Sequence, residues 1–248
     1  NTGWSAVLGT LCVLTFALMA GTGIVLCMYY SPSPDKAYAS IDYIMESVPG
    51  GALIRGLHHW GAGAMVLVVF LHLLTSFFSG TYKAPREITW ITGVGLLLVT
   101  LGLGFTGYLL PWDQKAFWAT VVGARLPSEI PVIGKWLTHL ILGGPTVSGF
   151  TLTRFYAVHM LILPAAIVLL AAFHIYLVRL HGIAEFRPVD DERDGVYRFY
   201  PEHLARGAVA FAILVLVLVL LSLKAGVPRE AIAGTVDERY APRPEWYF

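Results

Sequence analysis

Residues 57–79 read LHHWGAGAMVLVVFLHLLTSFFS and residues 155–178 read FYAVHMLILPAAIVLLAAFHIYLV, and each apolar stretch carries a histidine near both of its ends. These histidines form two pairs, separated by fourteen and fifteen residues: His58 with His72, and His159 with His174. A helix turns about 100° per residue, so fourteen residues return to within about 40° of the starting face and fifteen to within about 60°. The members of a pair would lie about 21 Å apart along the axis, inside a bilayer core about 30 Å thick. Two such helices side by side would therefore form two stacked bis-histidine sites.

Ionisable side chains at membrane depth are costly, which makes these histidines candidates for function. A single membrane histidine can also serve only to hydrogen-bond a neighbouring helix. Four histidines in two matched pairs favour haem ligation, because neutral imidazole is a common axial ligand. Two axial histidines fill both free iron positions, so such a haem would transfer electrons and would not bind oxygen. Cys12 and Cys27 form no C-x-x-C-H run, and we expect non-covalent haems.

The composition is that of a membrane protein, because 56% of the residues are hydrophobic and only 13% are charged. Soluble domains carry about 25% charged residues. The formal net charge of +1 does not indicate nucleic-acid binding. Five stretches are long enough to cross a bilayer: 4–30, 57–79, 88–110, 155–178 and 207–223. We expect an all-α, multi-pass integral membrane protein, placed in a bacterial inner membrane, with a four-helix di-haem bundle followed by at least one further transmembrane helix.

The segment 111–154 is too polar to span the membrane and too apolar for an ordinary loop. It contains two short amphipathic pieces, Ala116–Arg125 and Gly134–Leu142, and we expect it to lie at the membrane interface and cover a site. The segment 179–206 carries charges of both signs, which is typical of a solvated connection. Basic residues are spread over both sides and do not settle the orientation. The short loop Gly80–Glu87 carries two of them, which favours the cytoplasmic side for this loop.

Glycines repeat the spacing of the histidines in the other two spans. Gly9 and Gly23 are fourteen residues apart, and so are Gly93 and Gly107. A residue without a side chain lets a flat macrocycle approach the helix backbone, so these helices are expected to flank the haems. Ordinary packing of small residues between membrane helices is the alternative. The shared period favours the haem interpretation.

Several longer motifs lie along nearly the whole chain. They are Leu57-His58-His59-Trp60 with His72, Lys83-Ala84-Pro85-Arg86-Glu87, Gly107-Tyr108-Leu109-Leu110-Pro111-Trp112-Asp113-Gln114, Ile130-Pro131-Val132-Ile133-Gly134, Leu152-Thr153-Arg154-Phe155-Tyr156, and Pro244-Glu245-Trp246-Tyr247-Phe248. In these motifs the chain resembles cytochrome b of the cytochrome bc and bf complexes. The fifteen-residue histidine gap and the run Pro-Trp-Asp-Gln are closer to the chloroplast and cyanobacterial type than to the mitochondrial type.

The resemblance implies two haem b groups. It implies one ligand from each helix at each haem: His58 and His159 for the iron near the positive side, His72 and His174 for the iron near the negative side. Arg55 and Arg154 match positions near the positive-side haem, where a guanidinium pairs with propionates; anchoring a helix end at the headgroups is the alternative. Arg179 matches a basic residue at the negative-side site of the chloroplast type. Val7 stands where that type attaches a third haem through cysteine, so no covalent haem is expected there.

The resemblance also implies a quinol-oxidation site on the positive side, between the segment 111–154 and the terminal Pro-Glu-Trp-Tyr motif. Glu245 would accept a quinol proton, with Tyr108 and Phe105 in the wall of the site. Without the resemblance, Glu245 would be read as an interfacial acid beside a tryptophan. The chain would divide into a di-haem bundle, 1–180, and a part, 181–248, that holds the negative-side loop, the fifth span and the start of the quinol-site loop.

The function implied is that of the haem- and quinone-binding subunit of a proton-translocating quinol:cytochrome c oxidoreductase, or of one with a plastocyanin-like acceptor. The partners implied are a Rieske iron–sulfur protein, a c-type cytochrome subunit, quinone, the lipid bilayer and a second copy of the complex. Further spans are expected beyond Phe248, on this chain or another. The alternative is a di-haem b membrane anchor of a dehydrogenase or hydrogenase, which would lack the segment 111–154 and Pro-Glu-Trp-Tyr. A transporter or structural bundle is the rival without redox chemistry.

Overall fold

The computed structural model describes residues 4–182, 199–234, 240, 243 and 245–248. Within these ranges the chain is helical, without a strand, and has a single isolated β-bridge. The helices follow one another in this order: η1 (Trp4–Val7), α1 (Leu8–Cys27), α2 (Ala37–Glu46), α3 (Gly51–Phe78), α4 (Glu87–Tyr108), α5 (Gln114–Ser128), α6 (Gly134–Leu142), α7 (Gly149–Ala157), η2 (Val158–Ile162), α8 (Leu163–His181), η3 (Phe199–His203) and α9 (Leu204–Lys224).

Five of these helical stretches are long and apolar enough to cross a membrane, and the predicted all-α membrane fold is confirmed. They run over Leu8–Cys27, Gly51–Phe78, Glu87–Tyr108, Gly149–His181 and Tyr200–Lys224. Two begin six residues earlier than the sequence pattern predicts. Gly50 adopts a left-handed backbone conformation (φ +74°) that lets α3 begin at Gly51. At the start of α7, Ser148 and Thr151 form a capping box that satisfies the first backbone donors.

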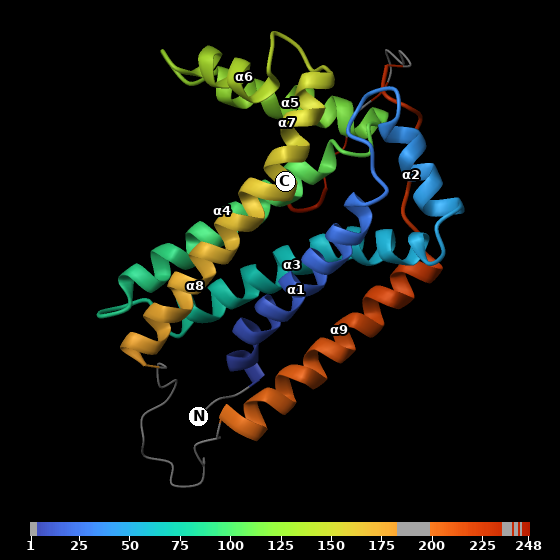
Figure 1. Ribbon diagram of the computed structural model, residues 1–248. Coiled ribbons are helices and arrows are strands. Elements are labelled where there is room, and N and C mark those ends of the chain that lie inside the picture. The colour runs from blue at the N-terminus through green and yellow to red at the C-terminus, as the bar shows by residue number, and fades with distance from the viewer. Residues whose placement is uncertain (1–3, 183–198, 235–239, 241–242, 244) are drawn as a thin grey trace, which may run out of the picture.

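The transmembrane helices pack as two neighbouring pairs, with α1 along α3 and α4 along α8, while α9 lies against α3 and α1 (Figure 1). Small residues permit the close approach of α3 to its neighbours. A Cβ atom added at Gly61 would lie 2.6 Å from Met19 Sδ on α1, and one added at Gly56 would lie 2.6 Å from Ser222 Cβ on α9. Dispersion contacts of this kind, rather than a hydrophobic driving force, hold helices together in a bilayer.

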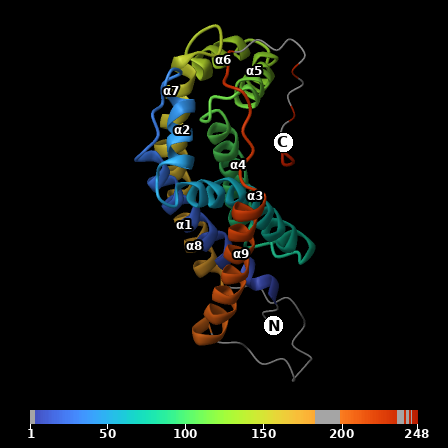
Figure 2. The same ribbon diagram turned by 90° about the vertical axis from the view of Figure 1, so that its right-hand side faces the viewer.

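The helices α5 and α6 lie across one end of the bundle, above α4 and α7 (Figures 1 and 2). They coincide with the two amphipathic pieces of the segment 111–154. Asp113 begins α5 by accepting a hydrogen bond from the Ala116 backbone N–H at 2.8 Å. Trp136 and Leu140 on α6 keep 67% and 51% of their surface exposed, as an interfacial helix does.

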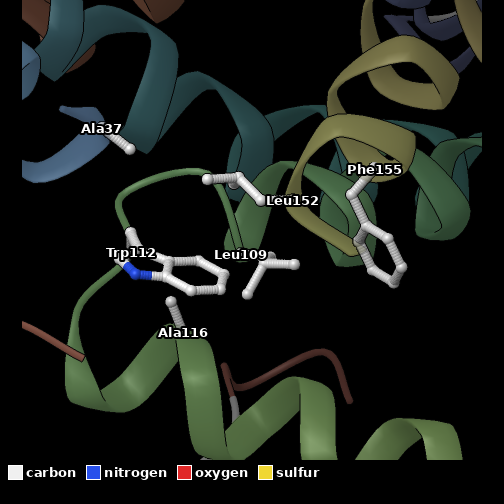
Figure 3. Packing of buried hydrophobic residues seen from close by; sticks show 6 residues of the cluster. All are labelled: Ala37, Leu109, Trp112, Ala116, Leu152 and Phe155. Carbon is white, nitrogen blue, oxygen red and sulfur yellow. The ribbon is translucent and has the colours of Figure 1, made fainter. Parts of the chain in front are cut away.

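A buried cluster fastens this end to the bundle, at the point where α2, α5, α7 and the end of α4 meet (Figure 3). Its members are Ala37, Leu109, Trp112, Ala116, Leu152 and Phe155. Trp112 lies in the left-handed region of the backbone (φ +54°), which is unfavourable for a bulky residue. Because Trp112 is only 7% exposed, burial of its ring offsets this strain at the corner between α4 and α5.

After α9 the chain returns to that corner. The Gln114 N–H donates to the Ala231 carbonyl at 2.9 Å, and the Ala233 N–H donates to the Trp112 carbonyl at 3.0 Å. Trp60 on α3 also donates its indole N–H to the Gly226 carbonyl at 2.9 Å. These contacts bring residues 245–248 beside α3 and α4. The predicted charged connection is 179–206, and most of it, residues 183–198, lies outside the described residues. Pro244 of the terminal motif also lies outside them.

Candidate functional site

The structure brings the four predicted histidines together in two places inside the bundle. His58 and His72 lie on α3, His159 lies in η2, and His174 lies on α8. Near the α5 end, the His58 and His159 rings lie in an edge arrangement, with centroids 6.3 Å apart and planes inclined by 74°. At the opposite end, His174 lies close enough to His72 for electrostatic interaction. Each place therefore draws one imidazole from α3 and one from the helical stretch Gly149–His181.

A π-helical turn explains why one pair is spaced by fourteen residues and the other by fifteen. The turn covers Val158–Ile162 and contains His159 itself. Such a turn accommodates one extra residue without breaking the helix, so the longer spacing still returns to the same face. Pro164 lies two residues after this turn, and it has no N–H for the carbonyl four residues earlier. The proline is the sequence signal that could have predicted the widened turn.

The separation of the paired rings fits a six-coordinate metal between them. Metal–nitrogen bonds to histidine are about 2 Å long, so two of them, with about 1.1 Å from each ring nitrogen to its centroid, place the centroids about 6 Å apart. The observed 6.3 Å is close to that value. The gap between His58 and His159 therefore has the width that a bis-histidine haem requires.

Threonine hydroxyls hold three of the four imidazoles. Thr22 Oγ1 lies 3.0 Å from His58 Nδ1, Thr92 Oγ1 lies 2.9 Å from His174 Nδ1, and Thr106 Oγ1 lies 3.2 Å from His159 Nδ1. The Leu103 carbonyl also lies 3.1 Å from His159 Nδ1. Contacts at Nδ1 leave Nε2 of these rings for a metal, which is the usual arrangement around a ligating histidine.

The four glycines of the fourteen-residue repeat each face one of the histidines. An added Cβ would lie 3.4 Å from His72 Cε1 at Gly9, 3.1 Å from His58 Cε1 at Gly23, 3.4 Å from His174 Cε1 at Gly93, and 2.6 Å from His159 Cε1 at Gly107. The sequence analysis expected these positions to make room for a macrocycle. The structure shows that they make room for the imidazole rings, which approach the backbones of α1 and α4. Their contact with haem itself stays a prediction.

The three arginines of the predicted site lie in different surroundings. Arg55, in the first turns of α3, is 7% exposed and donates from Nη1 to Met45 Sδ at 3.4 Å. The Asp113 carboxyl lies within its electrostatic reach, and burial raises the pKa of Asp113. Arg154 is exposed and donates to the Leu140 carbonyl of α6. Arg179 lies exposed in the last turn of α8, beyond His174. Propionate and quinone roles for these residues stay predictions.

The predicted quinol-site residues meet where α4 ends and α5 begins. Glu245 Oε1 accepts a hydrogen bond from Lys115 Nζ at 2.8 Å, and Lys115 Nζ lies 5.3 Å from the centroid of the Tyr108 ring. Burial lowers the pKa of Lys115, but hydrogen bonds to Glu245 and Tyr108 outweigh burial and raise it above the ordinary lysine value. Burial, with the nearby Glu245 charge, raises the pKa of Tyr247 to about 12.

Aromatic side chains of the terminal residues pack against α3 and α4. Trp246 Nε1 lies 3.3 Å from the Cβ position of Gly63, and Tyr247 Cε2 lies 3.2 Å from that of Gly104. The rings of Phe105 and Phe248 are 6.0 Å apart between centroids. The result is an apolar packing contact beside the Lys115–Glu245 ion pair.

Two features of this arrangement were missed in the sequence analysis. The first is the set of threonines, although the dipeptide Thr-Gly occurs at three of the four repeated glycines, at 22–23, 92–93 and 106–107. The second is Lys115, which directly follows the run Pro-Trp-Asp-Gln. The repeated dipeptide could have signalled the threonines, whereas nothing in the sequence links Lys115 to a residue 130 positions later.

Residues 2–182 match the protein family described as Cytochrome b/b6/petB, over a range that contains all four histidines and all four glycines. The chain belongs to the cytochrome b family. It is therefore a multi-pass membrane subunit of an electron-transport oxidoreductase complex of the bc or b6f kind, and membership implies haem b.

Similar proteins include subunits of several such complexes. A cytochrome bc complex cytochrome b subunit of Chlorobaculum thiosulfatiphilum is 37% identical over 251 residues, which cover 97% of this chain and 56% of that protein. The menaquinol:cytochrome c reductase cytochrome b subunit of Bacillus subtilis (strain 168) is 48% identical over 164 residues, covering 66% of this chain and 73% of that protein. Cytochrome b6 of Heliobacterium mobile is 43% identical over 178 residues, covering 72% of this chain and 84% of that protein. The chain thus spans little more than half the length of the first of these relatives.

A solved structure titled Hyperthermophilic respiratory Complex III contains a chain with the same fold. The two chains superpose with a TM-score of 0.87 at 31% identity, over 100% of this chain and 68% of the other. The two chains are therefore similar in sequence as well as in fold, in agreement with the family assignment.

Proposed function

We propose that this cytochrome b subunit carries two haem b groups and binds quinol in a proton-translocating quinol:cytochrome c reductase, or in a reductase with a plastocyanin-like acceptor. The observation that carries the proposal is the pairing of His58 with His159 and of His72 with His174 between the same two helical stretches. The two places lie at different depths of the bundle. Bound haem would supply reversible one-electron exchange at each depth, and the subunit would conduct electrons across the membrane.

The chain's own residues prepare each place for haem. Threonine hydroxyls accept from Nδ1 of three imidazoles and orient the rings, which leaves Nε2 of each for a metal. Glycines on α1 and α4 admit the rings without steric conflict. Arg55, buried three residues before His58, supplies a cation on the α5 side for the propionates of that haem.

Quinol oxidation is assigned to the region where α4, α5 and the terminal residues meet, which by family resemblance is on the positive side. Glu245 would accept a proton from a quinol hydroxyl, with Phe105, Tyr108 and Tyr247 around the ring. Lys115 pairs with the Glu245 carboxylate and holds it against α5. A carboxylate that is partly exposed, with aromatic side chains beside it, is suited to take up a proton and release it to water.

Two electrons from quinol would take different routes in this proposal. One would leave to a Rieske iron–sulfur partner and a c-type cytochrome, while the other would cross the bundle to a quinone-reduction site at the His72–His174 end. Moving one charge through 100 mV costs about 2.3 kcal/mol, which quinol oxidation must supply. The released and consumed protons would lie on opposite sides of the membrane. The complex would assemble as a dimer.

The di-haem anchor of a dehydrogenase or hydrogenase explains the histidines but leaves other parts of the molecule without a role. It does not require α5 and α6 across the end of the bundle. Nor does it require the chain to return after α9 and place Glu245 beside Lys115. These features favour the quinol reductase.

The test is the variant Glu245→Gln in the intact complex, assayed with added quinol across a range of pH. Glutamine keeps the size of the side chain and removes the base, so turnover should fall about 100-fold, the lower range for general acid–base catalysis. Haem content and both midpoint potentials should stay unchanged, because Glu245 lies at the edge of the bundle. Glu87→Gln, an exposed acid at the start of α4, is the matched control and should keep full turnover. Wild-type turnover in Glu245→Gln would show that the proton leaves quinol by another route.

A further inference from the structure

The hydroxyl support of the imidazoles is unequal between the two ends of the bundle. Three of the repeated glycines follow a threonine, but Gly9 follows Leu8. At the α5 end both rings, His58 and His159, face a threonine hydroxyl. At the other end only His174 does, and among the residues that the structure describes no side-chain hydroxyl reaches His72.

We propose that Thr22, Thr92 and Thr106 are positioning residues that set the donor strength of the haem ligands, and that Leu8 leaves His72 without this support and thereby raises the midpoint potential of its haem. The proposal rests on the proposed function, because it requires haem between the histidine pairs. It concerns residues that lie behind the ligands.

The direction of the hydrogen bonds follows from the helix backbone. Thr22 Oγ1 donates its only proton to the Leu18 carbonyl at 2.8 Å, Thr106 Oγ1 donates to the Gly102 carbonyl at 2.8 Å, and Thr92 Oγ1 donates to the Thr89 carbonyl at 2.8 Å. A hydroxyl whose proton is used in this way can only accept from the facing imidazole. The proton of each of these three rings is therefore on Nδ1, and the Nε2 lone pair is available to iron.

The orientation of His72 differs as this interpretation requires. At Gly23, Gly93 and Gly107 the imidazole nitrogen nearest to the added Cβ is Nδ1, at 3.8, 3.9 and 3.1 Å. At Gly9 the nearest nitrogen of His72 is Nε2, at 3.8 Å, and Nδ1 lies at 4.0 Å. Without a hydroxyl at position 8, next to Gly9, the ring is not held with Nδ1 against α1.

The chemical consequence concerns the iron. An imidazole that donates its other N–H to an acceptor is a more basic ligand, and a more basic ligand favours the oxidised metal. Two supported ligands at the α5 end should lower the midpoint potential of that haem. One supported ligand at the other end should leave the second potential higher, and an electron would then pass between the haems from the α5 end without an uphill step.

The test is Leu8→Thr, with Leu8→Val as its matched control, because valine has the shape of threonine without the hydroxyl. Redox titration of the intact complex, followed by visible absorbance, should show that Leu8→Thr favours the oxidised form of the His72–His174 haem by about tenfold relative to Leu8→Val. For one electron that factor is 59 mV. Thr92→Val should shift the same haem by a similar factor in the opposite direction, and Thr22→Val should do so at the other haem only.

The outcomes separate this inference from the proposed function. If the unaltered complex shows two b-type components, and neither Leu8→Thr nor Thr92→Val moves a potential relative to its control, the tuning role is refuted while the haem sites stand. If the unaltered complex lacks two such components, the proposed function fails first. Should Leu8→Thr not assemble, Thr92→Val and Thr22→Val decide the question, since a shift at the wrong haem or at both haems also refutes the assignment.

Discussion

Gly107→Ala should remove or strongly weaken one haem and spare the other. The added Cβ would lie 2.6 Å from Cε1 of His159, 3.1 Å from Nδ1 and 3.3 Å from Nε2. Carbon atoms in contact are usually 3.5–4.0 Å apart, so the ring must move by about 1 Å. Its Nδ1 is held by Thr106 at 3.2 Å and by the Leu103 carbonyl at 3.1 Å, which opposes that movement.

The size of the effect follows from the cost of overpacking. Extra methyl groups in a tightly packed site cost about 1–3 kcal/mol, and each 1.4 kcal/mol is a factor of ten in affinity. Haem affinity between His58 and His159 should therefore fall about 5- to 140-fold in Gly107→Ala. Gly93→Ala is the matched control, because its added Cβ would lie 3.4 Å from His174 Cε1 and needs only a slight adjustment.

The assay is the haem content per polypeptide in the purified complex, with the two components resolved by redox titration. We expect Gly107→Ala to lose the component that His58→Ala also loses, and Gly93→Ala to keep both. Full retention of two haems with unchanged midpoint potentials in Gly107→Ala would refute the steric argument. Equal losses in the two alanine variants would show that the different distances at the two glycines do not matter.

Three further outcomes follow from the same geometry. His72→Ala should lose one haem and keep the other, since each place draws one ligand from each of two helices; loss of both haems from a correctly inserted variant, seen in the reduced-minus-oxidised spectrum, would contradict the pairing. Acidified organic solvent should extract both haems, because acid protonates the histidine ligands and no thioether bond joins the porphyrin to the chain. Haem still attached to the denatured chain would contradict this. Lys115→Met should lower the maximal rate of quinol oxidation about tenfold, which is the range of one charged hydrogen bond, whereas Lys115→Arg should keep most of the rate. The measurement is steady-state kinetics on variants that retain both haems, and equal rates in the two variants would contradict a role for the charge.

Much of the bundle could be predicted from local periodicity. The five spans, the single face of each histidine pair and the matching glycine spacing are properties of one helix at a time, so composition and a 3.6-residue repeat suffice to find them. The two short helices α5 and α6 could also be predicted, because Gly134–Leu142 and most of α5 are amphipathic over their own length. Their position at the membrane interface stays a prediction. Helix boundaries were less accurate, since Gly50 and the Ser148 capping box act through backbone geometry.

The sequence by itself determined that this chain crosses a membrane with four histidines turned inward in two layers, because burial in lipid and helical periodicity are written into consecutive residues. Only the tertiary structure decided that the turn around His159 widens and that threonines of α1 and α4 stand behind the ligands. It also decided that Lys115 meets Glu245. The physical reason is that these contacts join residues from different helices, whose mutual placement depends on packing across the whole bundle and not on the pattern within any one segment.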